Sequence, residues 1–245
     1  ENILRPILAD HADTALSKIT RRSISRGIDK RKDTPAQARN YLDAMRGLFR
    51  WCEESQLGRD PTAGLKVTRA ETDGFPVWTA DDIARFRRHW PVGTRERVMF
   101  DIFYLTGLRR GDAARLGKQH ARSGVIEIDT EKTGTRVTLR ILPELQATLD
   151  AGPTGELAYI AAVDGQPLTK ESVGNLFRDA CRAAGIKKSA HGLRKAAATR
   201  AAENGATVAQ LEALFGWTGG QMASLYTRSA DRKRLALEAA DLLAA

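Results

Sequence analysis

Two short motifs contain arginines whose side chains could bind a phosphate group. In the first, Thr106-Gly-Leu-Arg109, a glycine able to end a helix precedes an arginine, and the rigid fork of arginine N–H donors matches phosphate oxygens. Asp112 follows three residues later and could hold the Arg109 guanidinium in one orientation. Taken alone, this motif also fits a surface Arg–Asp pair.

The second motif is His191-Gly-Leu-Arg194. Residues i and i+3 share one face of a helix, so a proton carrier and a permanent cation would project together from such a helix. The alternative is an ordinary exposed His/Arg pair. If both motifs belonged to one site, that site would hold two cations suited to phosphate and one proton carrier.

Aromatic and basic residues elsewhere could complete this chemistry. Gly216 and Trp217 are followed by Tyr226, nine residues beyond the tryptophan. Lys132 stands at the tip of a predicted hairpin. Each has a common structural explanation, because Tyr and Trp rings usually pack in a core and a lysine at a loop tip is usually only solvated.

The elements that must position these residues are mostly helices. Thr79 and Asp82 have the spacing of a capping box, and Trp78 and Ile83 stand where a hydrophobic staple would be, so a helix is predicted to start there. Further helices are predicted at residues 95–106, from 113, and at 169–184, 191–204, 207–216 and 234–245. Thr207 and Gln210 also have the spacing of a capping box. Tyr226 is expected in a short segment before the last of these helices.

One small antiparallel sheet is also predicted. Residues 125–130 and 136–141 are short β-rich runs on either side of Lys132-Thr133-Gly134, which is a hairpin signature. The chain is therefore expected to be mainly α with a small antiparallel β-sheet.

The chain is expected to have two domains. A helix is predicted from Pro35, with an apolar stripe through Tyr41, Met45 and Cys52. Polar residues without periodicity then lead to Gly74 and Pro76, which predicts a linker. We assign residues 1–68 to a helical domain, 69–76 to the linker and 77–245 to a second domain.

Composition favours an anionic partner. The chain has 245 residues with 39 Lys+Arg and 30 Asp+Glu, for a net charge of +9, and it contains two basic clusters near residues 18–26 and 30–32. A merely soluble basic protein is the alternative. Hydrophobic residues make up 42%, which excludes a disordered polar chain.

Other features bear on metals and location. Cys52 and Cys181 lie far apart without His or Cys neighbours, so no metal cluster and no other cofactor is expected, and two lone thiols fit a reducing compartment. There is no apolar run of about 20 residues and no charged-then-apolar leader. We expect a cytoplasmic protein that does not enter the membrane.

In order and spacing, the motifs of the second domain resemble the catalytic domain of the tyrosine recombinases, or phage integrase family. That family combines Thr-Gly-Leu-Arg and a following acidic residue with a hairpin Lys-Thr, then His-x-Leu-Arg, then Gly-His/Trp with a tyrosine nine residues later. Trp217 stands where most members have histidine. The resemblance covers the chain from about residue 76 to its end.

The resemblance implies a catalytic set and a reaction. The implied catalytic residues are Arg109, Lys132, His191, Arg194, Trp217 and Tyr226, with Asp112 supporting Arg109. Tyr226 would attack a DNA phosphodiester to give a 3′-phosphotyrosyl enzyme, and Lys132 would protonate the leaving 5′ oxygen, without metal or ATP. An ordinary tyrosine has a pKa near 10, so phenolate at pH 7 costs about 4 kcal/mol, and two nearby guanidiniums are expected to lower that pKa.

The resemblance also implies an assembly. The helical core-binding domain and the catalytic domain would form a C-shaped clamp on double-stranded DNA carrying inverted-repeat core sites. The helix at residues 234–245 would dock on a neighbouring copy in a homotetramer, with accessory DNA-bending or directionality factors as further partners. The protein would then act at the bacterial nucleoid, as the integrase of a phage or another mobile element.

Three other functions stay open at this stage. A type IB topoisomerase-like enzyme uses similar chemistry as a monomer. A catalytically silent DNA-binding protein could share the fold, although the complete set of reactive side chains argues against it. A basic helical protein that binds no DNA would lack the steep dependence of DNA affinity on salt.

Overall fold

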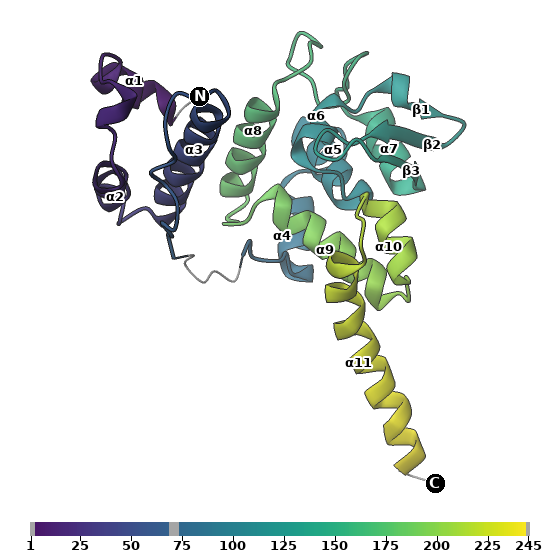
Figure 1. The fold of residues 1–245 in the computed structure, drawn as a ribbon. Coiled ribbons are helices and arrows are strands. Elements are labelled where there is room, and N and C mark those ends of the chain that lie inside the picture. The colour runs from purple at the N-terminus through teal and green to yellow at the C-terminus, as the bar shows by residue number, and fades with distance from the viewer. Residues whose placement is uncertain (1–2, 69–73, 244–245) are drawn as a thin grey trace. The chain divides into compact units, whose positions relative to one another are not determined.

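The computed structural model describes residues 3–68 and 74–243, apart from several side chains of the last helix. The chain divides into two compact units, Glu1–Asp73 and Gly74–Ala245 (Figure 1). Of the predicted linker, residues 69–73 lie outside the described residues, and Gly74 to Pro76 belong to the second unit.

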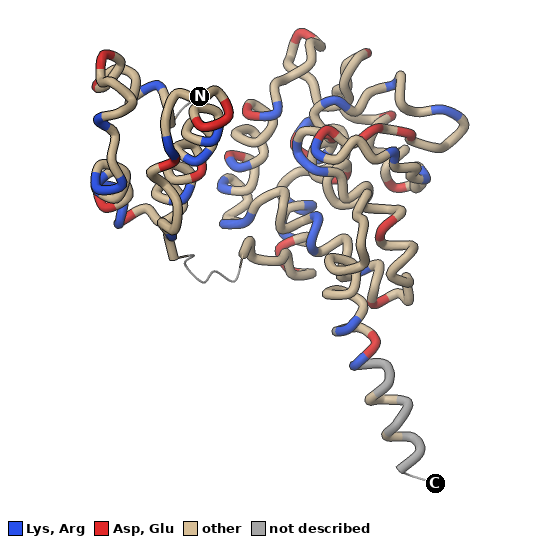
Figure 2. The backbone as a smooth tube through the Cα atoms, viewed as in Figure 1, with Lys and Arg blue, Asp and Glu red and all other residues tan. Residues whose placement is uncertain are grey.

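The first unit is helical. It consists of α1 (Leu4–His11), the 3-10 helix η1 (Leu16–Lys18), α2 (Arg21–Asp29) and α3 (Pro35–Glu54). The predicted apolar stripe of α3 is confirmed, because Tyr41, Leu42, Met45, Phe49 and Cys52 are buried together with Ile24 of α2. α2 carries Arg21, Arg22 and Arg26, so basic residues lie along it (Figure 2).

The second unit surrounds a larger core and includes the sheet. Its elements are α4 (Ala80–His89), α5 (Arg95–Asp101), the π-helix η2 (Ile102–Thr106), α6 (Arg110–Arg115), η3 (Lys118–His120), β1 (Ala121–Arg122), β2 (Val125–Asp129), β3 (Arg136–Arg140), α7 (Pro143–Ala151), α8 (Lys170–Ala183), α9 (Ala190–Glu203), α10 (Val208–Phe215) and α11 (Gln221–Leu243). The capping boxes predicted at Thr79 and Thr207 both form.

The predicted hairpin is confirmed. β2 pairs antiparallel with β3, with Val125 opposite Arg140 and Asp129 opposite Arg136, so Lys132 lies in the connecting turn. Alternate residues of both strands are buried, as the period of two requires. The short strand β1 was not predicted, because two residues of Ala and Arg leave no pattern in the sequence.

The predicted helix at 95–106 is wrong in its second half. It runs as α-helix to Asp101 and then as the π-helix η2. The Thr106 hydroxyl donates to the carbonyl of Ile102, and the helix ends at Gly107, whose φ of 62° lies in the left-handed region. Over a segment of five residues, a π and an α periodicity cannot be told apart in a sequence.

Three further predictions need correction. The helix expected from residue 113 begins at Arg110 and ends at Arg115. α7 was not predicted, although Pro143 occupies a first-turn position that suits proline. Tyr226 does not precede the last helix, because α11 is continuous from Gln221 to Leu243 and includes it.

Among the described residues, no helix is long and apolar enough to span a membrane.

Candidate active site

Arg194 joins the ends of two helices. Its Nη1 donates to the carbonyl of Gly107 at 2.5 Å, and its Nη2 donates to the carbonyl of Phe215 at 2.7 Å. These carbonyls lie at the C-terminal ends of η2 and α10, where backbone acceptors are unpaired and the helix dipole is negative. Arg194 is only 6% exposed, so it brings the three sequence motifs together from inside the fold.

The turn at Gly107 depends on the absence of a side chain. Besides its left-handed φ, a Cβ on Gly107 would lie 2.3 Å from Cε1 of Phe215. The same turn leads directly to Arg109, which occupies the N-cap position of α6 with an extended backbone. Glycine is therefore required for the approach of η2 to α10, and this approach places Arg109 beside Arg194.

Arg109 has an unsatisfied guanidinium. Its Nη1 is buried and finds no hydrogen-bond partner within the part of the chain that the structure describes. Burial and the charge of Arg109 lower the pKa of Arg194 to about 10, so the two guanidiniums repel each other across a short distance. Two adjacent cations, of which Arg109 has a donor without a partner among the described residues, could bind an anion such as a phosphate.

Tyr226 lies in a stack of aromatic rings. The Tyr226 and Trp217 rings are nearly parallel, with centroids 5.5 Å apart and an interplanar angle of 7°. Trp217 stacks in turn on Phe215 at 4.8 Å, and the Arg194 guanidinium carbon lies 5.3 Å from the centroid of Trp217. The stack holds the phenol next to Arg194. Phe215 was not singled out in the sequence, although it directly precedes Gly216.

The ionisation of Tyr226 differs from the expectation. Burial raises the pKa of Tyr226, and the charge of Arg194, which lowers it, is the smaller effect. Arg194 therefore acts in the predicted direction, but burial outweighs its effect, and the net pKa lies above the ordinary value. The aromatic stack removes the phenol from water, and one guanidinium does not compensate for that loss.

His191 lies at the exposed start of α9. Burial lowers the pKa of His191, and the charges of Arg194, Lys195, Arg109 and Lys132 lower it further. The imidazole is therefore held toward its neutral form, which can accept a proton. The same electrostatic contacts show that the hairpin lysine and both arginines lie within range of His191.

Asp112 is placed differently from the prediction. It is 1% exposed, and its Oδ1 accepts hydrogen bonds from Arg115 Nη2 at 3.1 Å and from the backbone N–H of Glu131 at 2.7 Å. Across the described residues, no hydrogen bond or ion pair joins Asp112 to Arg109. Asp112 therefore anchors the turn next to Lys132 rather than the arginine.

Other contacts hold the same turn. The hydroxyls of Thr130 and Thr133 lie 2.8 Å apart, and Lys170 Nζ of α8 donates to Glu131 Oε1 at 2.5 Å. The ion pair lowers the pKa of Glu131. Thr133 belongs to the predicted hairpin turn, but the contacts of this turn were not predicted, because nothing in the sequence indicates which helix faces the hairpin.

We expect replacement of Asp112 by alanine to loosen this turn. The N–H of Glu131, which lies in a part-buried hydrogen bond, would lose its carboxylate acceptor, which costs about 1–3 kcal/mol of unfolding free energy, and hydrogen exchange of that amide would accelerate. Urea unfolding and amide exchange measure the two effects. Asp112→Asn keeps an acceptor oxygen and should retain most of the protection, whereas Asp129→Ala removes only an exposed ion pair of the same hairpin. Unchanged exchange at Glu131 in Asp112→Ala would contradict this assignment.

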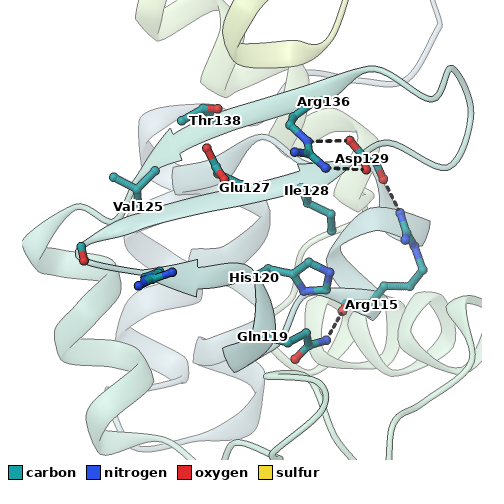
Figure 3. Close-up of a pocket in the computed structure, with 11 residues that line it drawn as sticks. Arg115, Gln119, His120, Val125, Glu127, Ile128, Asp129, Arg136 and Thr138 are labelled. Carbon is teal, nitrogen blue, oxygen red and sulfur yellow. Dashed lines mark hydrogen bonds and ion pairs between the residues drawn. The ribbon is translucent and has the colours of Figure 1, made fainter.

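A separate hollow of about 780 Å³ lies on the sheet, and none of the predicted site residues lines it. Figure 3 shows Arg136 paired with Asp129 across β2 and β3, at 2.9 Å and 3.0 Å. Arg115 is held there by the backbone carbonyl of Asp129 and by Asp112. Arg115 and Arg136 already have acceptors in this hollow, whereas Arg109 has a buried Nη1 without an acceptor among the described residues, so the pair Arg109 and Arg194 is the stronger candidate for an anion site.

A metal site is not evident in the described segments. They contain no group of three or more His, Cys, Asp or Glu side chains that could hold a metal ion. Cys52 and Cys181 are both buried and unpaired with each other, and burial raises the pKa of Cys181 to about 12.

Known proteins are similar to this chain in sequence and in fold. The chain is 25% identical over 214 residues to the tyrosine recombinase XerD of Listeria monocytogenes, covering 79% of this chain and 72% of that protein. A lambda integrase dimer bound to a COC′ core site is similar in structure, with a TM-score of 0.76, 20% identity and coverage of 90% of this chain and 87% of that chain. A lambda integrase tetramer bound to a Holliday junction has a TM-score of 0.74 at 20% identity and covers 90% of this chain and 70% of that one.

These structural likenesses show the fold, a mostly helical unit with a small three-stranded antiparallel sheet. The family model described as the phage integrase family matches residues 79–233, which include every motif from Thr106–Arg109 to Tyr226. This match shows that the chain belongs to the phage integrase family, the tyrosine recombinases that its motifs resemble.

Proposed function

We propose that this protein is a site-specific DNA recombinase that breaks and rejoins strands through Tyr226. The observation that carries the proposal is the convergence of Arg109, Arg194 and the Tyr226 phenol. Family membership and relatives named as tyrosine recombinases support it. The solved structures in complex with DNA support double-stranded DNA as the partner.

In the first step, the Tyr226 oxygen attacks a DNA phosphorus and loses its proton. A phosphorus–oxygen bond to the tyrosine forms, and the bond to the 5′ oxygen breaks. Arg109 and Arg194 would bind the non-bridging oxygens and stabilise the charge that builds in the transition state. A bound phosphate would also relieve the repulsion between the two guanidiniums.

The leaving 5′ oxygen needs a proton, which we assign to Lys132 at the hairpin tip. His191, held toward its neutral form, would accept the proton of the phenol or exchange it with the phosphate. Trp217 would pack beside the phosphate and donate its indole N–H, since it cannot shuttle protons. The raised pKa of Tyr226 makes this proton acceptor more important than the sequence suggested.

The second step reverses the first with a different strand. The 5′-hydroxyl of the partner strand attacks the phosphotyrosine and releases the enzyme. The covalent link conserves the energy of the phosphodiester, so rejoining needs no ATP. The two arginines would provide the positive charge that a metal ion provides in other phosphoryl transfers.

Recombination of two duplexes requires several copies of the enzyme. We infer that the copies assemble as a tetramer on DNA through α11, and a lambda integrase tetramer of similar fold supports this. Leu225 and Leu237 of α11 are 62% and 63% exposed, which leaves apolar surface for a neighbouring copy. The basic helix α2 would grip the DNA backbone from the first unit.

The test is covalent capture of DNA. The full chain is incubated with fragmented genomic DNA of its source organism, denatured, and the attached fragments are sequenced, while nuclease digestion and mass spectrometry locate the nucleotide. We expect a 3′-phosphate on Tyr226 and recurring inverted repeats, also in the presence of a chelator. Attachment without recurring sequence would favour a type IB topoisomerase. Salt-dependent binding without attachment would favour a silent DNA-binding protein, and no binding would exclude DNA as the partner.

A further inference from the structure

The chain from Gly74 to Trp78, here called the strap, lies against the start of α9. It comes at the beginning of the second unit, directly after the chain leaves the first. Hydrogen bonds attach it at three points: Lys195 Nζ donates to the carbonyl of Phe75 at 3.0 Å, Lys188 Nζ to the carbonyl of Val77 at 2.8 Å, and Trp78 Nε1 to the carbonyl of Ser189 at 2.9 Å. The strap is thus held by side chains and backbone on both sides of His191.

Gly192 allows this close approach. A Cβ at that position would lie 2.3 Å from the carbonyl oxygen of Pro76 and 3.0 Å from Cδ1 of Trp78. Gly192 has an ordinary helical backbone, so its missing side chain serves the strap and not the backbone conformation. Glycine is therefore required at position 192 because the strap lies against it.

Phe75 of the strap contacts the His191 ring. The two ring centroids are 4.8 Å apart, with an interplanar angle of 58°. Phe75 is nevertheless 54% exposed, and it belongs to none of the hydrophobic clusters formed by described residues. The hydrogen bond from Lys195 to the Phe75 carbonyl holds this apolar ring at the surface, where it adds little to the core. Its contact with His191 therefore needs another explanation.

The contact changes the surroundings of the imidazole. Burial is the largest cause that lowers the pKa of His191, and the cations that face it are Arg194 and Lys195 of its own helix, Arg109 and the hairpin Lys132. The Phe75 ring lies against one side of the imidazole, and Lys195 donates to the carbonyl of Phe75. The strap therefore contributes to the burial of His191 and also fixes a neighbouring charge.

We propose that Phe75 is a positioning residue that holds the His191 ring in one orientation and shields it from water. The value of this position for catalysis rests on the proposed function of His191, whereas the contact itself does not. Because the strap is the point where the chain from the first unit enters the second, displacement of the strap would uncover a catalytic group.

The titration of His191 tests the contact without DNA. Histidine resonances of the full chain are followed by NMR against pH, and His191 is assigned with a His191→Asn variant among the four histidines. In Phe75→Ala we expect the pKa of His191 to rise toward its ordinary value, because burial is reduced. Phe75→Trp keeps an aromatic ring there and should restore the lowered pKa. Val77→Ala shortens an exposed side chain of the same strap and should leave it unchanged.

A second variant tests the same contact by displacing the strap instead of changing Phe75. Gly192→Ala places a methyl group against the Pro76 carbonyl, so it should displace the strap and raise the pKa of His191 with Phe75 intact. An unchanged pKa of His191 in both Phe75→Ala and Gly192→Ala would overturn the proposal. An equal rise in Val77→Ala would also overturn it, because the effect would then belong to the strap in general and not to the ring.

Covalent attachment to captured DNA tests the catalytic part separately. We expect Phe75→Ala to slow attachment about tenfold, less than the 10²- to 10⁴-fold effect of losing a proton-transfer group, and Phe75→Trp to recover the rate. If the pKa of His191 shifts while attachment keeps its rate, the contact exists and the positioning role is wrong. If wild-type protein attaches to no DNA, the proposed function fails while the titration still decides the contact.

Discussion

Replacement of Tyr226 by phenylalanine is expected to reduce covalent attachment to DNA by about 10⁴-fold or more, as loss of a catalytic nucleophile does in other enzymes. The substitution removes only the oxygen that would attack phosphorus. A phenylalanine ring can keep the stack on Trp217, where the two rings lie nearly parallel at 5.5 Å. The measurement is the rate at which a denaturation-resistant protein–DNA complex forms on a fragment recovered by capture.

Fold and DNA affinity should be unaffected by the same change. Tyr159→Phe is a matched control, because burial also raises the pKa of Tyr159 and it lies in the second unit away from the predicted site residues. We expect wild-type attachment in Tyr159→Phe and wild-type melting and binding in both variants. Attachment by Tyr226→Phe at an undiminished rate would show that another group is the nucleophile.

Replacement of Arg109 or Arg194 by alanine is expected to slow attachment by about 10²- to 10³-fold each. Both guanidiniums face the position proposed for the phosphate, and each would stabilise charge that develops only in the transition state. Single-turnover rates at saturating DNA measure this effect apart from binding. The unfolding free energies of the two variants should differ sharply. This difference tests the contacts that we assign to Arg109 and Arg194.

Arg194→Ala leaves the carbonyls of Gly107 and Phe215 without their buried donor. We expect its unfolding free energy to fall by about 2–4 kcal/mol in urea titrations. Arg109→Ala removes a side chain whose buried Nη1 has no acceptor among the described residues, and it relieves repulsion on Arg194. Its stability should stay the same or increase slightly, which is typical of residues retained for function.

Lysine substitutions refine this prediction. Arg194→Lys keeps the charge but loses the fork that reaches two carbonyls at once, so it should recover only part of the stability and of the rate. Equal loss of stability in Arg109→Ala and Arg194→Ala would contradict the assigned contacts. Full activity in either alanine variant would contradict the proposed phosphate site.

Much of the local structure could be predicted from the sequence. The capping boxes at Thr79 and Thr207, the hairpin around Lys132 and the apolar stripe of α3 all formed as expected. These features depend on residues two to four positions apart, or on paired strands joined by a short turn. The hydrogen bonds and the periodicity of these features therefore depend only on residues that are close together in the sequence.

The sequence also predicted a set of candidate site residues. Motif order selected Arg109, Lys132, His191, Arg194, Trp217 and Tyr226, and ring stacking or electrostatic contacts connect these residues in the fold. The sequence did not predict the ring stacking or the electrostatic contacts that connect these residues. Phe215, Glu131 and Lys170 also hold the site and have no motif of their own.

Only the tertiary structure decided how the site is held. Arg194 bonds to Gly107, 87 residues away in the chain, and the Asp112 carboxylate bonds to the hairpin at Glu131 instead of the nearby Arg109. The strap on His191 and the raised pKa of Tyr226 likewise arise from groups brought together by packing. Residue types determine which bonds and charges are possible. Which of them form depends on burial and on segments distant in the chain, and a linear pattern does not contain those distances.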